Sequence, residues 1–177
     1  MRTAFLVRFF LLGLALCAAA GNPVALPNGG SIGYSVHESQ TRFAIRTKDG
    51  KVHQLSVARD STVSGKLPPA DVKVVGELDN SAVILVDAYP SVPGGMSLCQ
   101  AGEEKFLRVI SIAKAPRQTF SVKLESCRQT IELAESGVEW KPESSTLTIH
   151  WPSGPSQTGK AETRAIRINR DGEPETH

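Results

Sequence analysis

The stretch Thr41–Arg59, TRFAIRTKDGKVHQLSVAR, decides the fold class. Apolar and polar residues alternate on both sides of Lys48-Asp49-Gly50, and a period of two is typical of a β-hairpin that buries one face. A three-residue loop at these positions sets Phe43 opposite Leu55, whereas a two-residue loop sets an apolar side chain against a polar one. The alternation therefore predicts the three-residue loop, with Gly50 in the left-handed conformation.

Short segments of the same kind continue along the chain, separated by Gly, Pro, Asn and Asp. Residues 82–86 are apolar on both faces, which indicates a central strand. Later the apolar residues change from even to odd positions near Cys127, which predicts a turn or bulge there. We expect an all-β domain over residues 21–170, built as a single antiparallel sandwich or a small barrel of about 8–10 short strands. The charged segment 171–177 is expected to be a flexible tail.

The N-terminus has the pattern of a secretory signal peptide. Two arginines accompany the apolar run Phe9–Leu16, and the small residues Ala18–Ala20 follow it. The run is too short to cross a membrane comfortably. We expect cleavage after residue 20 and a periplasmic or extracellular mature chain. A form that is lipid-anchored through Cys17 is the disfavoured alternative, because Leu16 is bulky where a lipidation site has a small residue.

The charge of the mature chain argues against two classes of partner. The sequence has 20 Lys plus Arg and 18 Asp plus Glu, and the signal peptide contains two of the arginines. The mature chain is therefore close to neutral and has no block of basic residues. A nucleic-acid partner needs a basic surface, so nucleic-acid binding is not expected. Membrane insertion of the mature chain is not expected either.

Two cysteines, Cys99 and Cys127, remain after cleavage of the signal peptide. An exported chain meets an oxidising compartment, so we expect one disulfide between them. The chain-entropy model assigns about 3.6 kcal/mol of stabilisation to a loop of this length. The bond would also hold the end of the preceding loop against the turn at Cys127.

No catalytic or metal-binding pattern is found in the sequence. The four histidines do not have the spacing of metal ligands, and no serine lies in a GxSxG motif. Glu103 and Glu104 are adjacent, so they point to opposite faces of a strand and are expected to be solvated charges. We therefore predict no catalytic residues, no metal ligands and no cofactor.

The loop Tyr89–Glu104, YPSVPGGMSLCQAGEE, is the candidate binding element. Its prolines stiffen it, which lowers the entropic cost of binding, and it carries apolar side chains among glycines. The residues expected to contact a partner are Tyr89, Val92, Gly94, Gly95, Met96 and Leu98. In the alternative interpretation, the tip of the loop packs onto the protein's own core.

These observations favour an exported, non-enzymatic binding module. It would dock the loop, pinned by the disulfide, on a protein partner such as an exported enzyme or toxin, as an envelope inhibitor or immunity-type protein does. One alternative is a structural or assembly component of the envelope that pairs through a sheet edge, for example at residues 163–169. A hydrolase with a dispersed site is the third and least favoured hypothesis.

Overall fold

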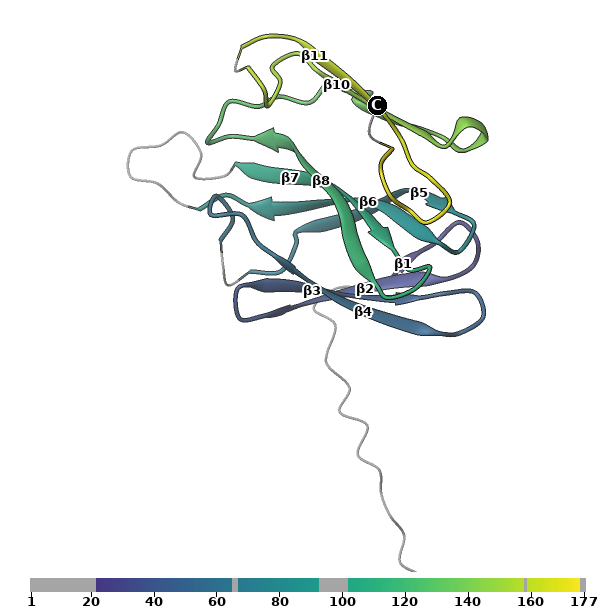
Figure 1. Cartoon of the computed structure of the whole chain (residues 1–177). Helices are drawn as coiled ribbons and strands as arrows, with labels where there is room; N and C mark the ends of the chain where they lie inside the picture. Colours follow the sequence, from purple (N-terminus) through teal and green to yellow (C-terminus); the bar gives the residue numbers. More distant parts are fainter. Residues whose placement is uncertain (1–21, 65–66, 93–101, 158, 176–177) are drawn as a thin grey trace, which may run out of the picture.

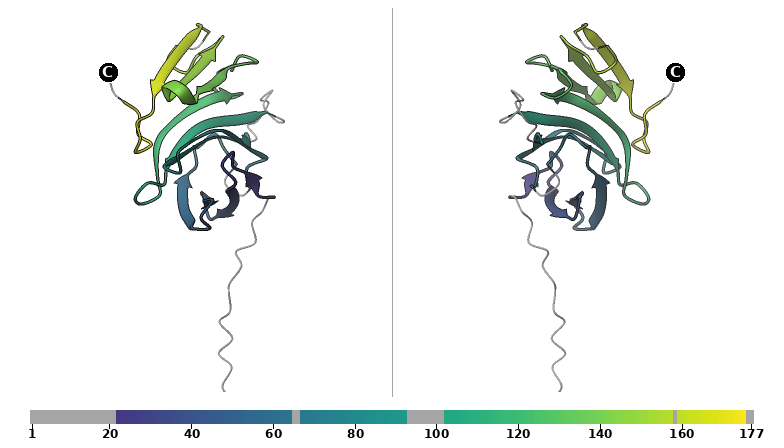
Figure 2. Two further views of the ribbon diagram at one scale, coloured as in Figure 1. Left: turned by 90° about the vertical axis from the view of Figure 1, so that its right-hand side faces the viewer. Right: turned by 90° about the vertical axis from the view of Figure 1, so that its left-hand side faces the viewer.

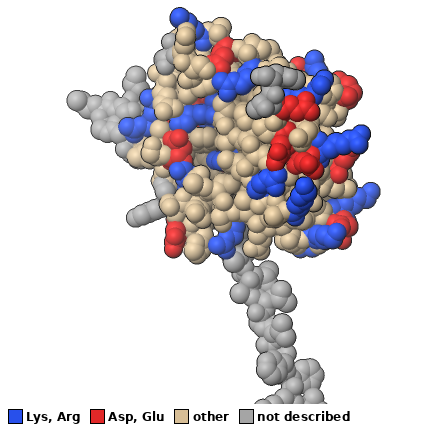
Figure 3. Space-filling view, viewed as in Figure 1, with Lys and Arg blue, Asp and Glu red and all other residues tan. Residues whose placement is uncertain are grey.

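The computed structural model describes residues 22–64, 67–92, 102–157 and 159–175. The signal peptide and the loop tip, residues 93–101, lie outside the described residues, so the predictions made for them remain predictions. Within the described ranges, no helix has the length and hydropathy needed to cross a membrane. On the face shown in Figure 3, basic and acidic side chains lie side by side, and neither sign forms a continuous surface.

The described part of the chain forms three antiparallel sheets that are stacked in layers (Figures 1 and 2). The first sheet has the order β1-β2-β3-β4 and contains β1 (Val24–Ala25), β2 (Ser31–His37), β3 (Gln40–Arg46) and β4 (Val52–Ala58). The central sheet has the order β5-β6-β7-β8 and contains β5 (Asp71–Leu78), β6 (Ala82–Pro90), β7 (Glu103–Ser111) and β8 (Arg117–Ser126). The third sheet has the order β11-β10-β9 and contains β9 (Val138–Lys141), β10 (Thr146–Trp151) and β11 (Glu162–Arg167), with the 3-10 helix η2 (Pro142–Ser144) after β9.

The all-β class is confirmed, and the arrangement is more elaborate than a single sandwich or a small barrel. The central sheet is covered by another sheet on each face, so two separate apolar cores form. One core lies between the first and central sheets and includes Phe43, Ile45, Val83 and Leu85. The other lies between the central and third sheets and is built around residues such as Trp151. A strand such as β6, buried on both faces, requires this layering.

The register predicted for the first hairpin is confirmed. Phe43 pairs with Leu55, and the backbone amide of Thr47 donates to the carbonyl of Lys51 at 2.9 Å, which leaves a three-residue loop. Gly50 has a φ of 84°, as this loop requires. The alternation of apolar residues was therefore sufficient to fix the pairing of β3 with β4.

The predicted break in apolar parity coincides with a turn after β8. Ser126 bridges Ile131, and Thr130, inside this turn, has a φ of 54°. Cys127 is the first residue of the turn. Because Cys99 lies outside the described residues, the predicted disulfide between the two cysteines remains a prediction.

The prediction of a flexible tail after residue 170 is wrong for the described residues up to Glu175. Ser111 Oγ donates to the carbonyl of Asp171 at 2.6 Å, and Thr119 Oγ1 donates to the carbonyl of Gly172. The amide of Glu175 donates to the carbonyl of Arg167 at 2.9 Å. The segment therefore folds back and attaches β11 to the end of the central sheet.

Candidate functional site

The candidate binding loop leaves the central sheet between its two middle strands, β6 and β7. Pro90 pairs with Glu103 at the ends of these strands, and the amide of Ser91 donates to the carbonyl of Gly102 at 2.9 Å. The backbone is therefore still hydrogen-bonded between the two strands at the point where the loop begins and ends. The residues between Val92 and Gly102 are not among those that the structure describes.

Two further contacts fix the position of Val92, at the start of the loop. Its amide donates to the carbonyl of Thr62 at 2.8 Å, and its carbonyl accepts from Arg128 Nη1 at 2.9 Å. Thr62 belongs to the connection between β4 and β5, and Arg128 belongs to the turn after β8. Two segments far apart in the sequence thus hold the first residue of the loop.

A buried carboxylate, Glu104, lies under the base of the loop. It accepts hydrogen bonds from Ser91 Oγ at 2.8 Å and from Thr62 Oγ1 at 2.9 Å, and Lys123 Nζ lies 3.6 Å away. Lys123 also contacts Asp60 at 3.2 Å. We call these five residues the Glu104 cluster. Because Glu104 is completely buried, its hydrogen bonds to the start of the loop and to the β4–β5 connection must be kept in the folded state.

Asp60 is the outermost carboxylate of the Glu104 cluster. Partial burial alone would raise its pKa, but hydrogen bonds from the hydroxyl and amide of Thr62 and from Lys123 outweigh that effect and lower the pKa. The carboxylate therefore remains ionised beside the ammonium group of Lys123.

A second polar group, which we call the Tyr89 chain, connects the first sheet to the central sheet. Arg59 Nε donates to Thr41 Oγ1 at 3.1 Å, and the Thr41 hydroxyl lies 2.8 Å from that of Tyr89. Tyr89 in turn donates to Asp87 Oδ2. Thr41 is on β3, whereas Tyr89 and Asp87 are on β6, so the hydrogen bonds cross the interface between two layers.

The Tyr89 chain ends in a buried ion pair. Arg108 Nε lies 2.9 Å and 2.8 Å from the two carboxylate oxygens of Asp87, and Arg108 Nη1 donates to Gln118 Oε1 at 2.7 Å. The side chains of Asp87 and Arg108 are 0% and 4% exposed. A buried pair of this kind persists only when its remaining polar atoms are also hydrogen-bonded.

Burial dominates the electrostatics of the Tyr89 chain. It raises the pKa of Asp87 despite the opposing effects of Arg108 and Tyr89. Burial and the neighbouring charge of Asp87 raise the pKa of Tyr89, and burial lowers the pKa of the Arg59 guanidinium. Arg59 Nη2 is buried and donates to no described residue. Asp87 itself is completely buried, so its carboxylate has no contact with solvent.

The ring of Phe106 separates the two polar groups. Arg108 lies over it at 5.2 Å from its centroid, and Lys123 lies at 5.4 Å. Tyr89 meets the same ring edge-on, with the centroids 6.0 Å apart. These contacts pack the charged side chains against an aromatic surface, which stabilises cations in a poorly hydrated environment.

The structure places only part of the predicted contact set. Tyr89 is completely buried, so its expected role as an exposed docking residue is wrong; it belongs to the core beneath the loop. Val92 is half-buried. Four of the predicted residues lie outside the described part of the chain, namely Gly94, Gly95, Met96 and Leu98.

The sequence reasoning missed the buried charges. Glu104 was expected to be solvated, and that prediction is wrong, although Glu103 and Glu104 do point to opposite faces. A signal was present for the ion pair: Asp87 follows five apolar residues, and Arg108 has two apolar residues on each side of it. A charge in such a strand needs a partner from another strand.

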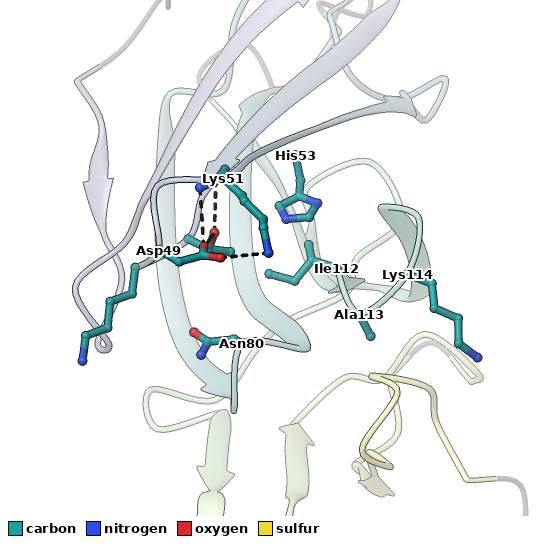
Figure 4. A pocket seen from close by; sticks show the side chains of 9 residues that line it. Asp49, Lys51, His53, Asn80, Ile112, Ala113 and Lys114 are labelled. Carbon is teal, nitrogen blue, oxygen red and sulfur yellow. Dashed lines mark hydrogen bonds and ion pairs between the residues drawn. The ribbon is translucent and has the colours of Figure 1, made fainter.

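A hollow of about 720 Å³ lies at the opposite end of the first and central sheets. Figure 4 shows His53 and Ile112 in its wall, with Lys51 paired to Asp49 at 3.0 Å. Lys114 points away from this pair in the same view.

Among the described residues, no group of three His, Cys, Asp or Glu side chains is placed to hold a metal ion. Comparison with protein-family models, curated proteins and solved structures finds no match to the chain.

Proposed function

We propose that the protein is an exported, non-enzymatic binding module that docks the segment Val92–Leu98 on a protein partner. The observation that carries this proposal is the Glu104 cluster. Glu104 accepts hydrogen bonds from Ser91, at the start of the loop, and from Thr62, in a neighbouring connection. Because the two ends of the loop are fixed in this way, the entropic cost of ordering the loop on a partner is lower.

The same contacts argue for a positional role of the buried carboxylates over a catalytic one. Asp87 and Glu104 both direct their oxygens to side chains of the protein itself. A general acid or base must reach a bound substrate within about 3 Å, or through one water. Residues that are completely buried and fully engaged do not offer such access.

The predicted disulfide between Cys99 and Cys127 would add a third attachment. Cys127 follows directly on β8, next to Arg128, which already binds the carbonyl of Val92. A covalent link from the far side of the loop to the same turn would restrict the loop from both ends. Peptide mapping of the non-reduced exported chain tests for it, and two free thiols in the correctly folded protein would contradict it.

Partner capture from an envelope extract tests the proposed function. The wild-type mature chain and a Met96→Asp/Leu98→Asp variant are immobilised, and the recovered proteins are identified by mass spectrometry. We expect a partner that the wild type recovers and the variant loses. The matched control is Val52→Asp, which alters a side chain that is 50% exposed on β4.

The control variant should recover the partner as the wild type does. Equal recovery by the wild type and the loop variant would contradict the proposal. Circular dichroism of all three proteins ensures that a loss reflects the loop surface and not unfolding.

A further inference from the structure

An apolar groove of about 510 Å³ opens between the central and third sheets, on the side where β5 and β9 form their edges. This volume falls in the range of sites that bind small molecules. The apolar side chains that line it are Val74, Val75, Val86, Leu124, Leu133, Val138 and Trp140.

The groove exists because the third sheet covers β5 incompletely. β9 spans only Val138–Lys141, whereas β5 spans Asp71–Leu78. Trp140 of β9 packs directly on Gly76, where a side-chain Cβ would overlap the indole ring. Lys73, nearer the start of β5, is exposed, so the third sheet leaves this part of the strand uncovered.

The groove reaches the middle of the central sheet. In β6, every residue from Ala82 to Tyr89 is buried except Val86, which is half-buried. Val86 lines the groove and packs against the core of the third sheet. An apolar ligand could therefore bury surface that folding alone leaves partly exposed.

One cationic side chain lies beside Val86, the half-buried residue at the bottom of the groove. Lys73 pairs with Val86 across β5 and β6, so the two side chains lie on the same face of the sheet. Lys73 is exposed and forms no ion pair with any described residue. On the opposite wall, Glu139 is paired with Lys141 at 3.5 Å, whereas Glu135, in the turn that precedes β9, forms no ion pair with a described residue either.

We propose that this groove binds a straight acyl chain with a carboxylate head group. The chain lies on Val86, Val75 and Leu133, and the carboxylate pairs with Lys73 Nζ at the rim. The register places Lys73 directly beside Val86, whereas Glu135 lies outside the strands in the turn that precedes β9, so a head group at the Val86 end of the groove lies beside an ammonium group.

Tryptophan fluorescence of the full mature chain tests the proposal. Trp140 lines the groove, whereas Trp151 is 2% exposed in the core, so Trp140 is expected to report binding. Decanoate, decan-1-ol and decyltrimethylammonium are titrated below their micelle-forming concentrations. We expect saturable binding, with decanoate tightest and the cationic amphiphile weakest.

The variant Lys73→Met removes the charge and keeps an unbranched side chain of similar length. It should weaken decanoate binding about two- to five-fold, the range of an exposed ion pair, and leave decanol binding unchanged. Val86→Phe should obstruct the groove and weaken both ligands, with thermal unfolding as the check that it still folds. Val52→Ser, on the far side of the first sheet, is the control for non-specific adsorption and should bind as the wild type does.

Three results would overturn the proposal: no saturable signal with any amphiphile, tighter binding of the cationic amphiphile than of decanoate, or equal binding of decanoate and decanol by the wild type. The second result would assign the head group to Glu135. None of these readouts depends on the loop at residues 93–101, so the groove and the proposed docking function succeed or fail separately.

Discussion

The hydroxyl oxygens of Tyr89 and Thr41 lie 2.8 Å apart in the interior, and this contact joins the central sheet to the first sheet. Both residues are completely buried. Removing the Tyr89 hydroxyl leaves Thr41 and Asp87 each short of one partner in a place that water does not reach. We expect Tyr89→Phe to lower the free energy of unfolding by about 1–3 kcal/mol, measured by urea denaturation.

The matched control for this substitution is Tyr34→Phe. Tyr34 is half-buried on β2, and its hydroxyl makes no hydrogen bond to another described residue. This variant should change the stability by less than about 0.5 kcal/mol. If the two substitutions cost the same, the Tyr89 chain does not connect the layers energetically.

The buried pair of Asp87 and Arg108 gives a second prediction. Arg108→Met strands a carboxylate whose two oxygens both lie within 3 Å of Arg108 Nε, so the free energy of unfolding should fall by about 3–5 kcal/mol. Adding Asp87→Leu removes the stranded charge and should restore most of the loss. As a comparison, Lys141→Met breaks an exposed pair with Glu139 and should cost about 0–1 kcal/mol. A double variant no more stable than Arg108→Met would contradict this account.

The sequence predicted the local pairings well because strand alternation and turn chemistry act over a few residues. The hairpin around Gly50 shows this, as does the turn at Asp79-Asn80, where both residues have positive φ values. The strand β2, SIGYSVH, was not predicted, because glycine and serine interrupt its apolar pattern. Its pairing with β3, including Tyr34 opposite Phe43, closes through a two-residue turn after His37, where Glu38 has a φ of 55°.

The arrangement of layers and the buried polar groups could not be read from such local patterns. Residues that share a face in sequence, such as Val83 and Leu85, do not reveal which sheet will cover them. Glu104 looks like the solvated end of a strand until the connection that carries Thr62 and the loop base at Ser91 close over it. The predicted contact residues depend on the same long-range placement, which explains why Tyr89 was misassigned.

Asp49, in the loop of the first hairpin, makes the stability depend on pH. Hydrogen bonds from Thr47 and from Lys51 lower its pKa from 3.8 to about 2. Because the folded-state pKa is the lower one, the stabilisation is present above about pH 4 and disappears as the pH falls towards 2. Asp49→Asn should therefore be less stable than the wild type at pH 7, and the difference in midpoint should shrink at pH 2.5. A difference that stays constant between the two pH values would contradict the assignment.

The last prediction concerns the segment that folds back after β11. Deleting residues 171–177 removes the carbonyls that accept from Ser111 and Thr119, and it exposes the surface of Ala82 against which Gly172 packs. We expect a lower thermal midpoint, with increased proteolysis of the third sheet because its attachment to the central sheet is lost. Deleting only residues 176–177 is the control and should leave the midpoint unchanged.

A point substitution separates loss of packing from shortening of the chain. Gly172 has a φ of 76°, and a Cβ there would lie 2.6 Å from the Cβ of Ala82. Gly172→Ala should therefore lower the free energy of unfolding by about 1–3 kcal/mol through crowding and strain. Gly159, with a φ of 79° and no atom within 4 Å of a built Cβ, has the same backbone strain without the crowding. If Gly159→Ala destabilises the protein as much as Gly172→Ala does, the contact between the C-terminal segment and β6 contributes nothing measurable.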